Sequence, residues 1–153
     1  MKTESSLPLV SLYAGFTRGC ERLNWLAPLL IRLVFGYFWL ETGWAKLHNL
    51  DGFTERFIGW GVPFPAFSAA LSAWAELIGG GLMMLGLATR PTMVALIINM
   101  LVAMALVVLP PIGTLDEFVE LDETLYVLVF FWLLMAGPGK ASVDHLIAKR
   151  FGL

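Results

Sequence analysis

The chain has 153 residues, of which 58% are hydrophobic and 14% are charged, and its mean hydropathy is +0.77. A soluble domain of about 150 residues leaves roughly 30% of its chain surface in water, which is too much for so apolar a composition. The composition therefore disfavours soluble globular, disordered and fibrous proteins, and a net charge of −2 offers no basic footprint for nucleic acid. A single cysteine, Cys20, excludes an internal disulfide and a CxxC redox pair. We expect a small all-α integral membrane protein.

Residues 1–25 are predicted to form an interfacial or cytoplasmic segment that leads into the first membrane span. Only Lys2 precedes Glu4, Pro8 interrupts the apolar run, and no small-x-small cleavage pattern follows. These features disfavour a cleaved signal peptide.

Four apolar stretches are long enough, or nearly so, to cross a bilayer as helices of about 20 residues. They are residues 26–47, 66–88, 91–109 and 122–137, and they make residues 26–139 a four-helix transmembrane domain. The fourth stretch is short unless it begins near Asp122 or the bilayer thins locally. Pro65, Pro91 and Pro138 lie at the ends of these stretches, where proline is tolerated.

Residues 140–153 are predicted to form an amphipathic cytoplasmic tail. Val143, Leu146 and Ile147 lie near one helical face, with Lys149 and Arg150 beside it, a pattern that suits a helix on anionic lipid. A plain solvated tail is the alternative.

An even number of spans places both termini on one side of the membrane, and the charges indicate which side. That side carries seven basic residues, whereas the opposite loops carry Lys46, Arg56 and most of the acidic residues. Because cytoplasmic loops are enriched in Lys and Arg, both termini are predicted to be cytoplasmic. The seven basic residues are Lys2, Arg18, Arg22, Arg90, Lys140, Lys149 and Arg150.

Four polar residues lie inside the predicted spans, where an ionisable group is costly unless it is paired or hydrated. At about 1.5 Å per residue, they lie roughly 9, 12, 18 and 22 Å from the cytoplasmic helix ends. Small residues share a helix face with the first three, which predicts that they face the bundle interior. The Arg32 side chain is long enough to reach Asn99 and, at its limit, Glu76, so the set predicts a polar pocket. In order of depth the residues are Arg32, Asn99, Glu76 and Glu41.

Glu41 is expected to point away from Arg32, because nine residues correspond to two and a half helical turns. It shares a face with His48, so the first span presents polar groups on two sides. This arrangement predicts a partner chain or an outer cavity beside Glu41, whose carboxyl would exchange protons or bind a quinone carbonyl. Lys46 and His48 are placed at the outer rim of the pocket.

A purely structural interpretation competes with the site hypothesis, because a buried Arg–Glu–Asn cluster can simply fix helix register. Four aromatic residues are deep enough to line a ring-shaped ligand, although such residues also form membrane belts and packing contacts. They are Tyr37, Trp39, Trp74 and Tyr126.

Metal binding is not predicted. His48 and His145 lie a bilayer apart, and the acidic residues near His48 make a thin ligand set.

Six motifs follow one another in an order that resembles the DoxX family. They are LIRLVFG (30–36), ETGWAKL (41–47), GVPFP (61–65), AELIGGGLMMLGLATR (75–90), NMLVA (99–103) and AGPG (136–139). Together they cover about residues 26–144, and it is the ordered set that is specific rather than any single motif. The resemblance implies a four-helix bundle in the bacterial inner membrane, and carries over Arg32, Lys46, Glu76 and Asn99 as family-pattern residues without catalytic roles.

The resemblance also implies a redox setting, because the broader family includes a subunit of thiosulfate:quinone oxidoreductase and members linked to oxidative-stress complexes. We therefore expect a membrane subunit or accessory protein of a quinone-linked or oxidative-stress system, part of an oxidoreductase complex if it is catalytic, with a quinone as the candidate ligand. One alternative is a non-enzymatic scaffold that recruits cytosolic redox enzymes, and a weaker one is a small transporter or proton conductor. The expected partners are the lipid bilayer and other subunits or further copies of the chain.

Overall fold

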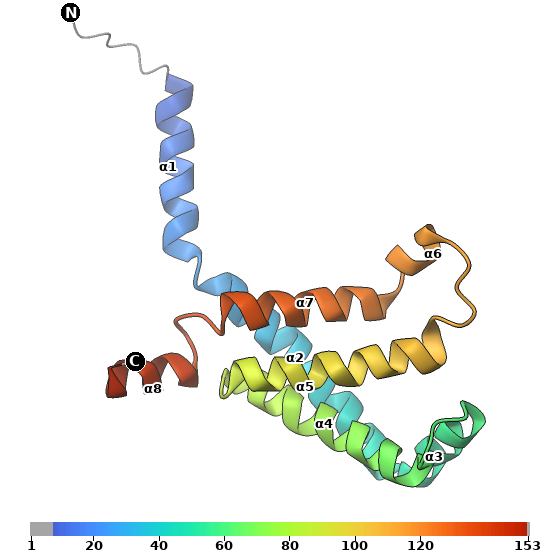
Figure 1. Cartoon of the computed structure of the whole chain (residues 1–153). Helices are drawn as coiled ribbons and strands as arrows, with labels where there is room; N and C mark the ends of the chain where they lie inside the picture. Colours follow the sequence, from blue (N-terminus) through green and yellow to red (C-terminus); the bar gives the residue numbers. More distant parts are fainter. Residues whose placement is uncertain (1–7, 153) are drawn as a thin grey trace, which may run out of the picture.

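A computed structural model describes residues 8–152, and within this range the chain forms helices joined by short turns and loops (Figure 1). The helices are α1 (Pro8–Leu23), α2 (Leu26–His48), α3 (Leu50–Gly59), α4 (Pro65–Leu85), α5 (Thr89–Ala103), the π-helix η1 (Met104–Val108), α6 (Leu115–Val119), α7 (Asp122–Ala136) and α8 (Val143–Phe151). The predicted all-α class is confirmed.

Three helical stretches are long and apolar enough to cross a membrane: Leu26–His48, Pro65–Leu85 and the continuous stretch Thr89–Val108. The helix α7 has 15 residues and therefore measures about 22 Å, less than the roughly 30 Å of a hydrocarbon core. Residues 8–152 thus hold three candidate membrane-spanning helices and a shorter apolar helix, as suits an integral membrane protein.

Helices α2 and α4 form the closest pair, because glycines allow their backbones to touch. A methyl group added at Gly43 would lie 2.7 Å from the Cα atom of Leu77, and one added at Gly80 would lie 2.7 Å from the carbonyl oxygen of Gly36. Such contacts are closer than real Cβ atoms allow, so these positions require glycine. The small-residue stripes of α2 and α4 face the bundle interior as predicted, whereas Ala95 in the predicted stripe of α5 is exposed.

The core of the bundle lies between α5 and α7. Met93, Leu96 and Met100 of α5 pack there with Phe130 and Leu133 of α7, and Trp39 of α2 joins the same cluster. A smaller cluster at the opposite side of the bundle packs α3 against the start of α4.

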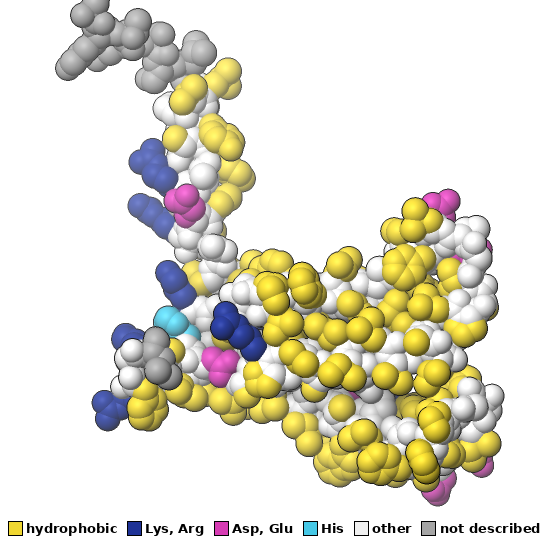
Figure 2. Space-filling model, viewed as in Figure 1, with side chains coloured by type: hydrophobic (Ala, Val, Ile, Leu, Met, Phe, Trp, Pro, Cys, Tyr) yellow, Lys and Arg dark blue, Asp and Glu magenta, His cyan; other side chains and the backbone are white. Residues whose placement is uncertain are grey.

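Helices α1 and α8 lie at one end of the bundle, whereas α3 and α6 lie at the other (Figure 1). Helix α1 projects away from that end at a steep angle to the spans, with exposed Leu12, Tyr13 and Phe16. Lys and Arg side chains gather at the α1 and α8 end, and acidic side chains occur at the α3 and α6 end (Figure 2). The two ends of the bundle therefore differ in charge.

The segment before α8 folds back onto the bundle. The amide of Asp144 donates to the carbonyl oxygen of Gly86 at 2.9 Å, and Gly139 lies against Pro28. Ser142 caps α8, because its hydroxyl accepts from the amide of His145 at 3.1 Å. The C-terminal segment and the first turn of α8 are thus part of the packed structure, while Leu146 and Phe151 further along α8 are exposed.

Candidate functional site

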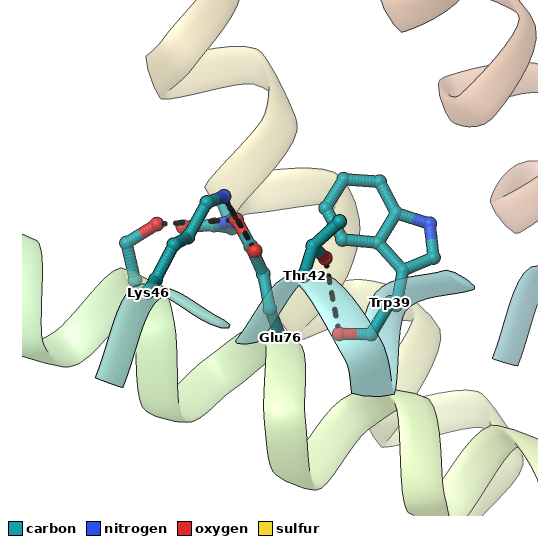
Figure 3. A network of polar contacts seen from close by, with 6 residues as sticks. Trp39, Thr42, Lys46 and Glu76 are labelled. Carbon is teal, nitrogen blue, oxygen red and sulfur yellow. Dashed lines mark hydrogen bonds and ion pairs between the residues drawn. The ribbon is translucent and has the colours of Figure 1, made fainter. Parts of the chain in front are cut away.

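An ion pair between α2 and α4 is the strongest polar contact inside the bundle. The Nζ atom of Lys46 lies 2.5 Å from both carboxylate oxygens of Glu76, and the two side chains point toward one another (Figure 3). The Glu76 side chain is 3% exposed and the Lys46 side chain is 30% exposed. A carboxylate this deeply buried requires such a partner, because an unpaired charge in an apolar interior is very costly.

Two further side chains complete the surroundings of Glu76. The Ser72 hydroxyl, one turn earlier in α4, donates to Oε1 at 3.5 Å, and the Nδ2 atom of Asn99 in α5 donates to the same oxygen at 3.4 Å. Three helices therefore contribute donors to one carboxylate, which fixes its position.

The position of Lys46 follows from the buried face of α2. Trp39 and Gly43 are buried, and Lys46 lies three residues beyond Gly43 on the same face. Side chains on a helix lean toward its N-terminus, so the long lysine chain extends back from the helix end into the bundle. Gly43 brings α4 close enough for the ammonium group to reach Glu76.

A cavity of about 750 Å³ lies next to this ion pair. Lys46, Glu76, Asn99, Ser72 and Thr42 are among its polar lining residues, and most of the remaining lining is apolar or aromatic. Ligand pockets of roughly 300–1,000 Å³ with apolar walls and a few fixed polar groups are typical of small-molecule sites. The cavity therefore has the size and the chemistry of a site for an apolar molecule with one polar end.

Aromatic rings form two walls of this cavity. On one wall Trp39 contacts Tyr126 edge to face at 5.3 Å between ring centroids, and Phe38 stacks on Tyr126 at 5.4 Å. On the other wall Phe53 and Phe57 of α3 pack edge to face at 4.8 Å. Such walls suit a flat ring compound, because aromatic faces and edges attract one another.

The π-helix η1 borders the same cavity with Leu106, Val107 and Val108. In a π-helix the hydrogen bonds run over five residues, as in the bond from the amide of Leu109 to the carbonyl of Met104 at 2.8 Å. π-turns within α-helices occur frequently at functional sites. The irregular stretch of the third span thus coincides with the cavity wall.

Several residues predicted for the site meet at this cavity. Glu76, Asn99 and Lys46 are in contact, and Trp39 and Tyr126 line the cavity beside them. Lys46 was expected at the outer rim, but it is the ionic partner of Glu76.

Arg32 lies elsewhere, so its expected contact with Asn99 or Glu76 is wrong. It is 1% exposed, and its Nη2 atom donates to the carbonyl oxygen of Ala141, while Nε and Nη1 have no hydrogen-bond partner among the described residues. The reason is the C-terminal segment, which folds back over the N-terminal half of α2, where the carbonyl oxygen of Ala141 accepts from the guanidinium.

Four other predicted residues point away from the cavity. Tyr37 and Trp74 are more than half exposed, because each lies two residues, or about 200° around the helix, from an inward residue of its own helix. Glu41 is exposed on the same outer face of α2, as its spacing from Arg32 predicts. His48 is exposed too, with its Nδ1 atom 3.0 Å from the carbonyl oxygen of Trp44.

Sequence reasoning did not include Thr42, Phe53 and Phe57 in the site. Thr42 was missed although it lies three residues after Trp39, a spacing that places both near one face. The two phenylalanines belong to α3, and their approach to Lys46, whose Nζ atom lies 5.0 Å from the Phe53 ring centroid, depends on tertiary packing.

Comparison with known proteins identifies the family. The model of the DoxX family matches residues 27–109. The uncharacterized membrane protein Rv3486 of Mycobacterium tuberculosis is 32% identical over 133 residues, covering 80% of this chain and 82% of that protein. The Bacillus subtilis protein named "Putative oxidoreductase CatD" is 34% identical over 126 residues, covering 81% of this chain and 89% of that protein. No solved structure matches the chain. With a family match over more than half its length and two similar proteins each aligned over at least 80% of both chains, the chain belongs to the DoxX family of membrane proteins.

Proposed function

We propose that this protein is the membrane subunit of a redox system and that the cavity beside Lys46 and Glu76 binds a quinone-like ring compound. The observation that carries the proposal is the cavity itself: about 750 Å³, aromatic on two walls, with one ion pair and one amide at a fixed place. The name of the Bacillus subtilis relative, which calls it an oxidoreductase, agrees with a redox role.

The proposed chemistry assigns separate roles to the polar groups. An ammonium group has three N–H donors, and two of them serve the oxygens of Glu76. The third is free to donate to a carbonyl or phenolate oxygen of a ring seated between Trp39 and Phe53. Asn99 orients the ring oxygen from the α5 side, and Glu76 holds the Lys46 ammonium group in place.

The proposed topology has four membrane helices, with both termini in the cytoplasm of a bacterial cell. Helix α7 is the fourth span, and its 15 residues cross the membrane where the bilayer thins or where its polar ends reach the interface. The basic end of the bundle, with α1 and α8, faces the cytoplasm, and the acidic end faces outward (Figure 2).

Ligand binding can be tested by titrating the purified protein in detergent with a soluble naphthoquinone and recording tryptophan fluorescence, because Trp39 and Trp60 line the cavity. We expect saturable quenching in the wild type. Ala95→Phe fills the cavity from an exposed position of α5 and should weaken binding at least about tenfold, as expected for blocked apolar contacts. The matched control is Ala105→Phe, an exposed alanine outside the cavity lining, which should bind as the wild type does.

Two results would count against the site. One is the absence of saturable quenching in the wild type, and the other is equal quenching in Ala95→Phe and in the Ala105→Phe control. Equal quenching would mean that the quinone reaches tryptophans at the lipid-facing surface only.

A second candidate function is a scaffold that recruits cytosolic redox enzymes, and the exposed basic side chains of α8 favour it. Removal of the whole tail would not test this idea, because Ala141 and Asp144 hold the bundle together. Lys149→Glu with Arg150→Glu changes only exposed positions at the end of α8. Loss of soluble partners on co-purification, with quinone quenching unchanged, would favour the scaffold.

A further inference from the structure

A second hollow lies at the basic end of the bundle, between the start of α5, the end of α7 and α8. It has a volume of about 580 Å³ and shares no lining residue with the cavity beside Glu76. The two spaces therefore serve different ligands if both are occupied.

The lining of this hollow carries three side chains that favour an anion: Arg90, Lys140 and His145. The single acidic residue of the lining is Asp144, and both of its oxygens are engaged by amides, at 2.7 Å from Ala88 and 2.8 Å from Thr89. Both oxygens of Asp144 are thus occupied by backbone amides of the first turn of α5. Arg90 and Lys140 have no ionic partner among the described residues. Figure 2 shows the Lys, Arg and His side chains that gather at this end.

A hydroxyl group in the lining also has no protein partner. Thr89 is fully buried, and its Oγ1 atom makes no hydrogen bond to any described residue. A buried hydroxyl is normally satisfied, but this atom is shielded from the surface, so it does not contact an occupant of the hollow.

Exposed apolar side chains continue from the hollow along both helices. On α5, Val94 and Ile98 follow Arg90 at intervals of four residues and are exposed, and Ile98 also lines the cavity beside Glu76. On α7, Trp132 and Leu128 precede Ala136, a lining residue, at the same intervals and are also exposed. A molecule with a charged head in the hollow would therefore find an apolar track for its tails.

We propose that this hollow binds the phosphate group of an anionic phospholipid, with the acyl chains lying along α5 and α7. Basic pockets at the cytoplasmic ends of membrane helices suit anionic headgroups, because each Lys or Arg near the surface attracts them. Arginine and lysine both bind phosphate oxygens. The inference depends on the membrane setting of the family and is independent of the quinone proposal.

The test is native mass spectrometry of the full chain in detergent, titrated with phosphatidylglycerol and, in parallel, with phosphatidylcholine of the same acyl chains. We expect a clear preference for phosphatidylglycerol in the wild type. Arg90→Gln with Lys140→Gln should weaken phosphatidylglycerol binding by about tenfold or more, given the attraction expected per basic side chain. The matched control is Lys149→Gln with Arg150→Gln, which removes two exposed charges at the same end but outside the hollow, and should change binding less than about twofold.

A charge-preserving variant, Arg90→Lys with Lys140→Arg, checks that the fold survives substitution and should retain the preference. Equal losses in the hollow variant and in the control would overturn the proposal, since they would indicate general surface charge. Binding of inorganic phosphate that displaces phosphatidylglycerol would overturn the lipid as the ligand and assign the hollow to a free phosphate. The naphthoquinone titration of the hollow variant should remain that of the wild type, which separates this site from the cavity beside Glu76.

Discussion

Asp144 in α8 caps the first turn of α5, although Thr89 lies 55 residues earlier in the chain. Its carboxylate oxygens accept from the amides of Ala88 at 2.7 Å and Thr89 at 2.8 Å. The first amides of a helix lack partners within the helix, and a carboxylate there also interacts favourably with the helix dipole. No side chain of the local sequence caps this helix, so the C-terminal segment supplies the cap.

Replacing this cap should destabilise the protein. Loss of a helix cap costs about 0.5–2 kcal/mol, so we expect Asp144→Ala to lower the free energy of unfolding by about 1–2 kcal/mol. The measurement is thermal unfolding in detergent, followed by circular dichroism. Glu21→Ala on the exposed face of α1 is the control and should change stability by less than about 0.5 kcal/mol. Equal Tm values for Asp144→Ala and the wild type would mean that water replaces the cap without loss.

Replacement of Ala88 by glycine should raise the stability of the protein. It adopts a left-handed conformation with φ 48° and ψ 41°, which costs an L-residue roughly 1–2 kcal/mol. Glycine avoids this strain but loses more entropy on folding, so Ala88→Gly should stabilise the protein by about 0.5–1 kcal/mol. Ala95→Gly, in the interior of the same helix, should destabilise it by about the same amount. The opposite signs make the comparison decisive, and a lower Tm for both variants would contradict the strain argument.

The helices of this protein could be predicted from the sequence because each long apolar run is bounded by Pro, Gly or charged residues. Each of the four predicted spans begins and ends within three residues of the observed helical stretch, namely α2, α4, α5 with η1, and α7. Helix η1 could not be predicted in the same way, because a π-turn arises from packing rather than from composition.

The candidate site was only partly predictable. Helical spacing placed Glu76 and Asn99 inside the bundle, since small neighbours marked their helix faces. Which polar side chains of different helices contact one another could not be predicted, because this depends on how far the helices are shifted along one another. Arg32 binds Ala141 since residues far away in the sequence fold back over it, and Lys46 takes its place beside Glu76.

Because α2 and α4 approach closely, Gly80 and the adjacent Gly81 should differ in how well they tolerate replacement by alanine. A methyl group at Gly80 would lie 2.9 Å from the Cα atom of Leu40, whereas one at Gly81 would meet only the Cδ1 atom of Leu40, at 3.7 Å. Overpacking of this kind costs about 1–3 kcal/mol, so Gly80→Ala should destabilise the bundle by that amount. Gly81→Ala should leave stability unchanged or slightly raise it, because alanine favours a helix over glycine. Thermal unfolding of the two variants side by side tests the register of the helix pair, and equal losses would contradict it.

The Lys46–Glu76 pair should show strong coupling in a double-mutant cycle. Removal of one partner of a buried ion pair leaves a charge in an apolar setting and can cost 3–5 kcal/mol. The partial exposure of Lys46 allows water to reach the pair, so we expect about 1–3 kcal/mol for Lys46→Met and for Glu76→Met. The double variant should lose less than the sum of the two single losses, because two apolar side chains leave no charge unpaired.

The cycle also separates a structural role of the pair from a role in binding. A stable double variant that no longer responds to naphthoquinone would show that the charges serve the ligand, because the fold would not need them. Additive losses in stability would contradict a direct interaction between Lys46 and Glu76. Replacing a buried ion pair with apolar side chains is often neutral for folding. If the Lys46–Glu76 pair is dispensable for stability but required for naphthoquinone binding, its role is to bind the ligand in the cavity.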